Sequence, residues 1–150
     1  MRVVVQKVKN ASVKVNNRLV GEIKNGLVVL AGYESSDNSE DISWMVQKII
    51  KMRIFDDSEN RLNFSLLDVN GEILLISQFT LHASVKKGNR PSYIKAADSK
   101  KAKQMYDQTI REFETLLKRK ISTGKFGANM EVSLVNNGPV TITIDTKKKE

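Results

Sequence analysis

Apolar residues recur at helical spacing in only two segments of this chain, whereas both of its ends follow the two-residue period of strands. The shorter helical segment has apolar positions at residues 42, 45, 46, 49 and 50, and Asp37 with Glu40 predicts its capping box. The longer segment spans Ser99 to Leu117. An amphipathic helix needs an apolar surface to cover, so two such helices among many strands predict an α+β fold.

The strand-like segments form three groups. The first third predicts strands over 3–8, 12–15, 19–23 and 27–33, with turns between them. A middle strand over 72–81 contains four consecutive apolar residues, which is typical of a strand buried on both faces. Two alternating segments near the C-terminal end flank a predicted turn at 136–139. We expect six or seven strands in mixed and antiparallel sheets, packed as a barrel-like sandwich with the two helices, in a single domain over 1–150.

The composition removes most familiar catalytic groups. The chain has no cysteine and one histidine, His82, which excludes disulfides, a cysteine nucleophile and a histidine cluster for a metal ion. The acidic residues Asp56, Asp57 and Glu59 do not follow the spacing of an EF-hand. We expect no metal and no cofactor. No apolar run approaches the roughly 18 residues of a membrane span, and the N-terminus lacks a secretion-signal pattern, so we expect a soluble, cytoplasmic protein.

Positive charge is concentrated in one part of the chain. The net charge is +8, and the window from Lys86 to Lys125 alone holds twelve cations against four carboxylates. Such a region produces a positive field that suits a polyanion, although a solvated helix face would have the same composition.

Two short segments are each open to two interpretations. Ser77 to Thr80 either ends the middle strand with satisfied side chains or offers backbone N–H groups to a ligand. A Ser77–His82 dyad is disfavoured, because five residues along a regular strand place the two side chains on opposite faces. Gly138-Pro139 is either a simple turn or a cis peptide that a ligand or partner approaches closely. Phe126, beside Lys125, either anchors the core or stacks on a nucleobase.

These segments resemble the two signature motifs of the D-aminoacyl-tRNA deacylase family, of the Gly-cisPro type. The motifs are Ser77-Gln78-Phe79-Thr80-Leu81 and Asn137-Gly138-Pro139-Val140-Thr141. Residues 1–6, 52–55, 87–92 and 123–128 are also similar to that family, in the same order. The chain departs from the family pattern at Asn137, where Asp is usual, and near Ser99, where Pro is frequent; these changes concern turn packing and the start of a helix.

The resemblance implies a homodimer in which Gly138-Pro139 of one subunit, with a cis peptide bond, reaches into the pocket of the other. Its backbone carbonyls would hold the α-amino group of the substrate and leave no room for an L side chain, so chirality would be read by exclusion. Glycine would then be accepted, which makes glycyl-tRNA mischarged on tRNA(Ala) a second implied substrate. Asn137, Phe126 and Met130 would also contact the substrate, with Phe126 against the terminal adenine.

The implied reaction is hydrolysis of the ester that joins a D-amino acid to the terminal adenosine of tRNA, assisted by the neighbouring ribose hydroxyl. The protein would supply positioning and an oxyanion site from the N–H groups near Phe79 and Thr80, while Ser77 and Gln78 shape the pocket. The basic window would bind the acceptor stem through phosphates, with Lys100, Lys101 and Lys103 as the candidate contacts. We expect tRNA as the partner, and neither DNA nor a membrane.

Two other functions compete with this interpretation. A non-catalytic, basic, dimeric RNA-binding module would bind tRNA equally well, so only turnover distinguishes it from an enzyme. A serine esterase for small molecules would be labelled at Ser77 by a fluorophosphonate, and we expect no such labelling because Ser77 lies in no G-x-S-x-G motif.

Overall fold

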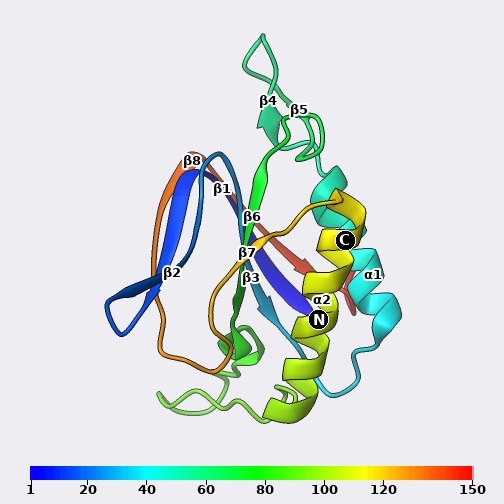
Figure 1. Ribbon diagram of the computed structural model, residues 1–150. Coiled ribbons are helices and arrows are strands. Elements are labelled where there is room, and N and C mark those ends of the chain that lie inside the picture. The colour runs from blue at the N-terminus through cyan, green and yellow to red at the C-terminus, as the bar shows by residue number, and fades with distance from the viewer. Residues whose placement is uncertain (150) are drawn as a thin grey trace.

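Strand β1 (Arg2–Val15) organises the fold, because it is long enough to pair with three other strands. Its N-terminal half pairs with β3 (Gly26–Gly32) and its C-terminal half with β2 (Arg18–Ile23). The antiparallel strand β8 (Glu131–Asp145) follows both halves. The sheet therefore curves strongly along β1, as Figure 1 shows, and this curvature confirms the predicted barrel-like architecture.

The middle of the sheet is parallel. Strand β6 (Glu72–Ser77) pairs in parallel with β3, and the short strand β7 (Ser122–Thr123) extends the sheet beyond it. Strands β4 (Phe55–Asp56) and β5 (Leu62–Phe64) form a separate hairpin that projects from one end of the molecule (Figure 1). The structure, which describes residues 1–149, thus has a mixed main sheet, and its strands outnumber the six or seven predicted.

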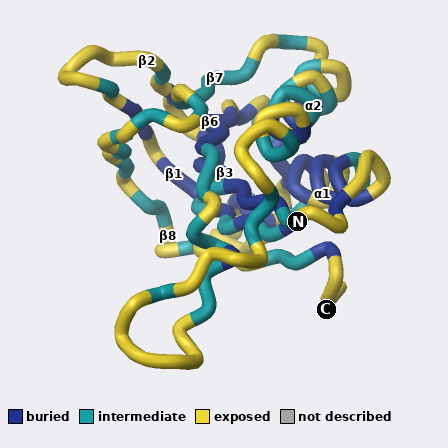
Figure 2. Tube along the Cα trace, turned by 90° about the horizontal axis from the view of Figure 1, so that it is seen from below, coloured by how far each residue is buried: buried dark blue, intermediate teal, exposed yellow. Residues whose placement is uncertain are grey.

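Two helices cover one face of this sheet. Helices α1 (Ser39–Lys51) and α2 (Ser99–Leu117) lie beside each other in Figure 1 and are joined by a hydrogen bond from Ser43 Oγ to Glu112 Oε1 (3.0 Å). Their apolar stripes bury the main core, and a second apolar cluster fills the curved side of the sheet. The central strands β3 and β6 are dark blue in Figure 2 because both of their faces are covered. Neither helix is long and apolar enough to cross a membrane in the described residues 1–149.

The start of α1 differs by one residue from the prediction. The capping residue is Asn38, whose Oδ1 accepts hydrogen bonds from the N–H groups of Glu40 and Asp41. In turn, the Asp41 carboxylate accepts a hydrogen bond from the Asn38 N–H. Asp37 instead faces inward and accepts from the Glu34 N–H (2.8 Å). Two adjacent residues can both cap a helix, and the sequence pattern cannot choose between them when the helix shifts by one position.

The middle strand is shorter than predicted. Its pairing ends at Ser77, which lies opposite Ala31, and residues Phe79–His82 form a single turn of 3-10 helix, η1. The Gln78 N–H still donates to the Ala31 carbonyl (2.7 Å), but the chain then turns away from the sheet. The strand prediction over 72–81 was therefore wrong for its last four residues.

The predicted turn at 136–139 is an excursion within one continuous strand. Strand β8 pairs with β1 on both sides of this segment, with Asn136 opposite Val8 and Thr141 opposite Gln6. One residue of β1 thus faces four residues of β8, so the extra residues have to bulge away from the sheet. The Gly138-Pro139 peptide bond within the excursion is cis.

Candidate functional site

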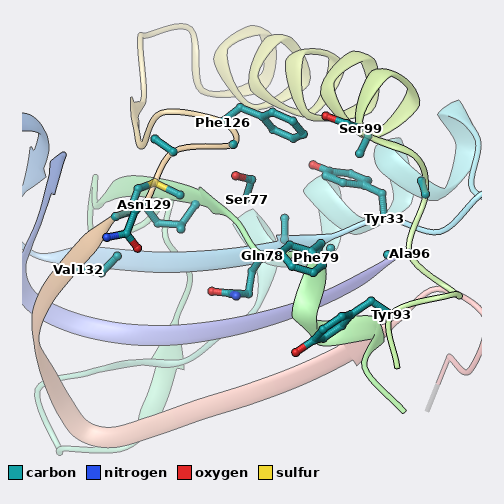
Figure 3. Close-up of a pocket in the computed structure, with 18 residues that line it drawn as sticks. Tyr33, Ser77, Gln78, Phe79, Tyr93, Ala96, Ser99, Phe126, Asn129 and Val132 are labelled. Atoms are coloured by element: carbon teal, nitrogen blue, oxygen red, sulfur yellow. The ribbon is translucent and has the colours of Figure 1, made fainter. Parts of the chain in front are cut away.

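A cavity of about 640 Å³ opens where the C-terminal ends of the parallel strands β3 and β6 meet the start of α2 (Figure 3). This is the edge at which sheets of parallel strands commonly bind ligands, because the chain leaves the sheet there. The lining comes from five parts of the chain: residues 31–33, residues 76–79, the segment 93–97 before α2, the start of α2, and residues 126–132. Ser99 and Ala102 are the contribution of α2.

Residues Ser77 to Phe79 line the cavity, and Thr80 follows them in the chain. The Thr80 hydroxyl accepts a hydrogen bond from Gln78 Nε2, which ties the two side chains together. Within residues 1–149, the N–H groups of Phe79 and Thr80 donate to no acceptor, and η1 has no side-chain cap. Two free N–H groups at the cavity edge are donors for a ligand that carries negative charge.

The Phe79 ring is 56% exposed and packs edge-on against Tyr93, with 5.0 Å between the ring centroids. Tyr93 belongs to the segment between η1 and α2 and lines the cavity beside Phe79, as Figure 3 shows. No periodicity in the sequence marks Tyr93, so sequence reasoning missed it. Two aromatic rings therefore form one wall of the cavity.

The opposite wall contains Phe126, whose half-buried ring packs on Tyr106 with centroids 5.6 Å apart (Figure 3). The ring contacts the core, as one of the two interpretations of Phe126 predicts, and it also lines the cavity. Its stacking on a nucleobase stays a prediction. Met130 lines the cavity as well, and its sulfur lies over Gly124, so a side chain at Gly124 would displace it. Both residues thus lie where a bound ligand would contact them.

Tyr33 closes the inner end of the cavity. Burial raises the pKa of its phenol well above the usual range, although a hydrogen bond with Thr109 Oγ1 (2.8 Å) acts in the opposite direction. The phenol is therefore a neutral hydrogen-bonding group at any ordinary pH. Its position at the end of the predicted strand 27–33 could have indicated this residue, since strand ends at this edge line such sites.

The other predicted site residues fall into two groups. Lys100, Lys101 and Lys103 lie on the first turns of α2, beside the two residues of that helix that line the cavity. Lys101 Nζ donates to the Ser35 carbonyl and Lys103 pairs with Asp107. In contrast, Asn137, Gly138 and Pro139 do not line this cavity, and Gly138 and Pro139 are exposed.

His82 takes no part in the cavity. Its side chain is 1% exposed, its ring nitrogens have no hydrogen-bond partner within residues 1–149, and Nδ1 lies 3.9 Å from Glu34 Oε2. Of the acidic residues considered as a cation site, Asp56 pairs with Lys7 (2.7 Å), and Asp57 accepts from backbone N–H groups of its own hairpin. Asp56 and Asp57 therefore stabilise the fold through these contacts.

Gly32 holds the cavity edge in place. A Cβ at this position would lie 2.7 Å from the Gln78 carbonyl oxygen and 3.1 Å from His82 Cδ2, so the chain leading into η1 would have to move. We expect Gly32→Ala to lower the free energy of unfolding in urea by about 1–3 kcal/mol, the usual cost of overpacking. Gly71→Ala is the control, because its closest neighbour is a side-chain methyl group of Leu66 and not a backbone atom. Equal losses in both variants would contradict this explanation.

Comparison with known proteins identifies the family. Residues 4–145 match the family described as D-Tyr-tRNA(Tyr) deacylase. The chain is 53% identical over its full length to a D-aminoacyl-tRNA deacylase of Flavobacterium psychrophilum, also matched in full, and 51% identical to that of Thermosipho africanus over 99% of both chains.

Two solved structures have the same fold as this chain. A structure titled c-Myc DNA Unwinding Element Binding Protein superimposes with a TM-score of 0.92 at 37% identity, covering 97% of this chain and 98% of its own. A probable eukaryotic D-amino acid tRNA deacylase has the same fold, with a TM-score of 0.82 at 18% identity over 95% and 97% of the two chains. The chain therefore belongs to the D-Tyr-tRNA(Tyr) deacylase family.

Proposed function

We propose that this protein hydrolyses the ester bond of D-aminoacyl-tRNA and releases the free D-amino acid and tRNA. The observation that carries the proposal is the pair of unpaired N–H groups of Phe79 and Thr80, which lie in a family motif at the edge of the cavity. Membership of a family whose relatives are named for this activity supports the same reaction.

The reaction needs little from the side chains. Water attacks the ester carbonyl, the two N–H groups stabilise the negative charge on its oxygen, and the bond to the ribose oxygen then breaks. The neighbouring ribose hydroxyl of the substrate assists the attacking water, and the ribose oxygen leaves as a hydroxyl. Ser77 and Gln78 shape the pocket, and Phe126 with Met130 supports the terminal adenosine. No cofactor takes part in this scheme.

Chiral selection requires a second copy of the chain. Gly138 and Pro139 are exposed, and they do not line the cavity of their own subunit, so they are free to enter the cavity of a partner. In this homodimer, their carbonyls and the neighbouring Asn137 hold the α-amino group of the substrate and exclude an L side chain. Glycine has no side chain to exclude, which makes mischarged glycyl-tRNA a substrate too.

Deacylation of matched D- and L-tyrosyl-tRNA, with a chelator present, tests the proposal. We expect release of tyrosine from the D-ester while the L-ester is spared. Hydrolysis of neither ester, together with salt-sensitive tRNA binding, would favour a non-catalytic RNA-binding module. Labelling of Ser77 by a fluorophosphonate would favour a serine esterase instead.

Thr80→Ala separates an oxyanion role from a nucleophilic one. The variant keeps the Thr80 N–H and loses only the hydroxyl that accepts from Gln78 Nε2. We expect the rate constant for D-tyrosyl-tRNA to fall by about tenfold or less, the loss expected for one hydrogen bond. Single-turnover kinetics measures this, with Thr143→Val as the control. A fall of more than about a thousandfold, as for a lost nucleophile, would contradict the backbone mechanism.

A further inference from the structure

The excursion that carries Gly138-Pro139 is held by side chains at the place where backbone pairing stops. Asn136 is the last residue of β8 to pair with β1 before the excursion, and Thr141 is the first to pair after it. Without other contacts, the residues between them would be tied only at their two ends. Loops of this kind have many conformations unless polar groups fix them.

The Asn136 side chain spans the base of the excursion. Its Oδ1 accepts from the Val140 N–H (2.9 Å), and its Nδ2 donates to Thr141 Oγ1 (2.9 Å). Thr141 Oγ1 also accepts from Gln6 Nε2 (3.3 Å), which belongs to the neighbouring strand β1. These bonds replace the missing backbone pairs and connect the excursion to the sheet.

Val140 connects this network to the dipeptide. Its side chain packs against the main apolar core, and this contact fixes the position of Val140. A Cβ at Gly138 would lie 2.8 Å from Val140 Cγ2 and 3.1 Å from the Val140 nitrogen, so Gly138 lies close to Val140. A change in the position of the Val140 backbone therefore moves Gly138 and Pro139 as well.

We propose that Asn136 is the positioning residue that sets the direction of the Gly138 and Pro139 carbonyls, through its bonds to Val140 and Thr141. The inference rests on the proposed function, in which these carbonyls select the D-substrate. It assigns to Asn136 no contact with the substrate. Loss of the Asn136 bonds lets the dipeptide move, so the excluded volume that rejects an L side chain becomes less well defined.

Four variants test this role. Asn136→Leu has a similar shape but makes neither bond, whereas Asn136→Asp keeps the acceptor for the Val140 N–H and allows the Thr141 hydroxyl to donate to it. Thr141→Val removes the link to Gln6. Thr143→Val is the matched control, because Thr143 is an exposed residue of the same strand and pairs with Val4, beyond the excursion.

Two readouts are needed. The first is the ratio of kcat/KM for D- and L-tyrosyl-tRNA, which we expect to fall by about tenfold in Asn136→Leu and Thr141→Val and to recover largely in Asn136→Asp. The second is hydrogen exchange of the Val140 amide, which we expect to become faster in Asn136→Leu but not in Thr143→Val. A purely structural role would lower the melting temperature and leave the ratio unchanged.

Each readout can overturn the inference. Unchanged exchange of the Val140 amide in Asn136→Leu would show that Asn136 does not hold the excursion. Faster exchange with an unchanged D/L ratio would show that the excursion does not need to be held for selection. If the wild-type protein hydrolyses neither ester, the proposed function fails, and Val140 exchange alone decides whether Asn136 holds the excursion.

Discussion

Gly138→Ala is expected to lower kcat/KM for D-tyrosyl-tRNA by about a hundredfold, the loss that a misplacement of about 1 Å can cause. Gly138 has a φ of +130°, which L side chains rarely adopt, and its added Cβ would lie 2.8 Å from Val140 Cγ2. The dipeptide has to shift to relieve both conflicts. In the proposed homodimer, its carbonyls would then no longer meet the α-amino group in the partner's cavity. Steady-state deacylation of the D- and L-esters measures the effect.

Gly88→Ala is the matched control for this experiment. Gly88 also has a positive φ, of +65°, but an added Cβ meets nothing within 4 Å. The control therefore also has a backbone penalty, but a smaller one, because a φ of +65° lies in the left-handed region that L residues can adopt, and it has no clash. We expect its deacylation rates to match those of the wild type. Binding of uncharged tRNA is expected to stay the same in both variants. Wild-type rates for both esters in Gly138→Ala would rule out the dipeptide as the chiral wall.

The sequence predicts best those elements whose burial is periodic. Helix α2 has the predicted bounds, Ser99 to Leu117, because one face of it packs on the core through all of its turns. Strand β6 was recognised from its apolar run, since the two apolar clusters cover its two faces. Such patterns arise because a whole helix or strand packs against the core, and they do not depend on the conformation of any single turn.

The cavity was less predictable, because its geometry depends on departures from regular structure. The strand ends at Ser77 only because η1 follows, and no periodic signal marks a single 3-10 turn. The excursion in β8 resembles a hairpin turn in sequence, since Gly and Pro favour both. Only the pairing of Asn136 and Thr141 with the same strand, β1, distinguishes the two arrangements.

Reversing the charge of Lys100, Lys101 and Lys103 together is expected to weaken tRNA binding and to reduce its salt dependence. Each phosphate contact contributes about 0.7 to 0.9 to the slope of log K against log salt, so the loss of three contacts lowers the slope by about 2 to 3. These lysines lie on the first turns of α2, next to the residues that line the cavity. Filter binding over a range of salt concentrations measures both quantities.

The control for this experiment has to change the net charge equally at another place. Lys9, Lys14 and Lys24 are exposed, lie on or beside β1 and β2, and do not line the cavity. Reversing them alters the long-range field in the same way but removes no proposed contact. If both triple variants lower the slope equally, the lysines of α2 act only through net charge. A small D-aminoacyl-adenosine ester has no acceptor stem. We therefore expect both variants to hydrolyse it at about the wild-type rate. This measurement separates an effect on RNA binding from an effect on the reaction itself.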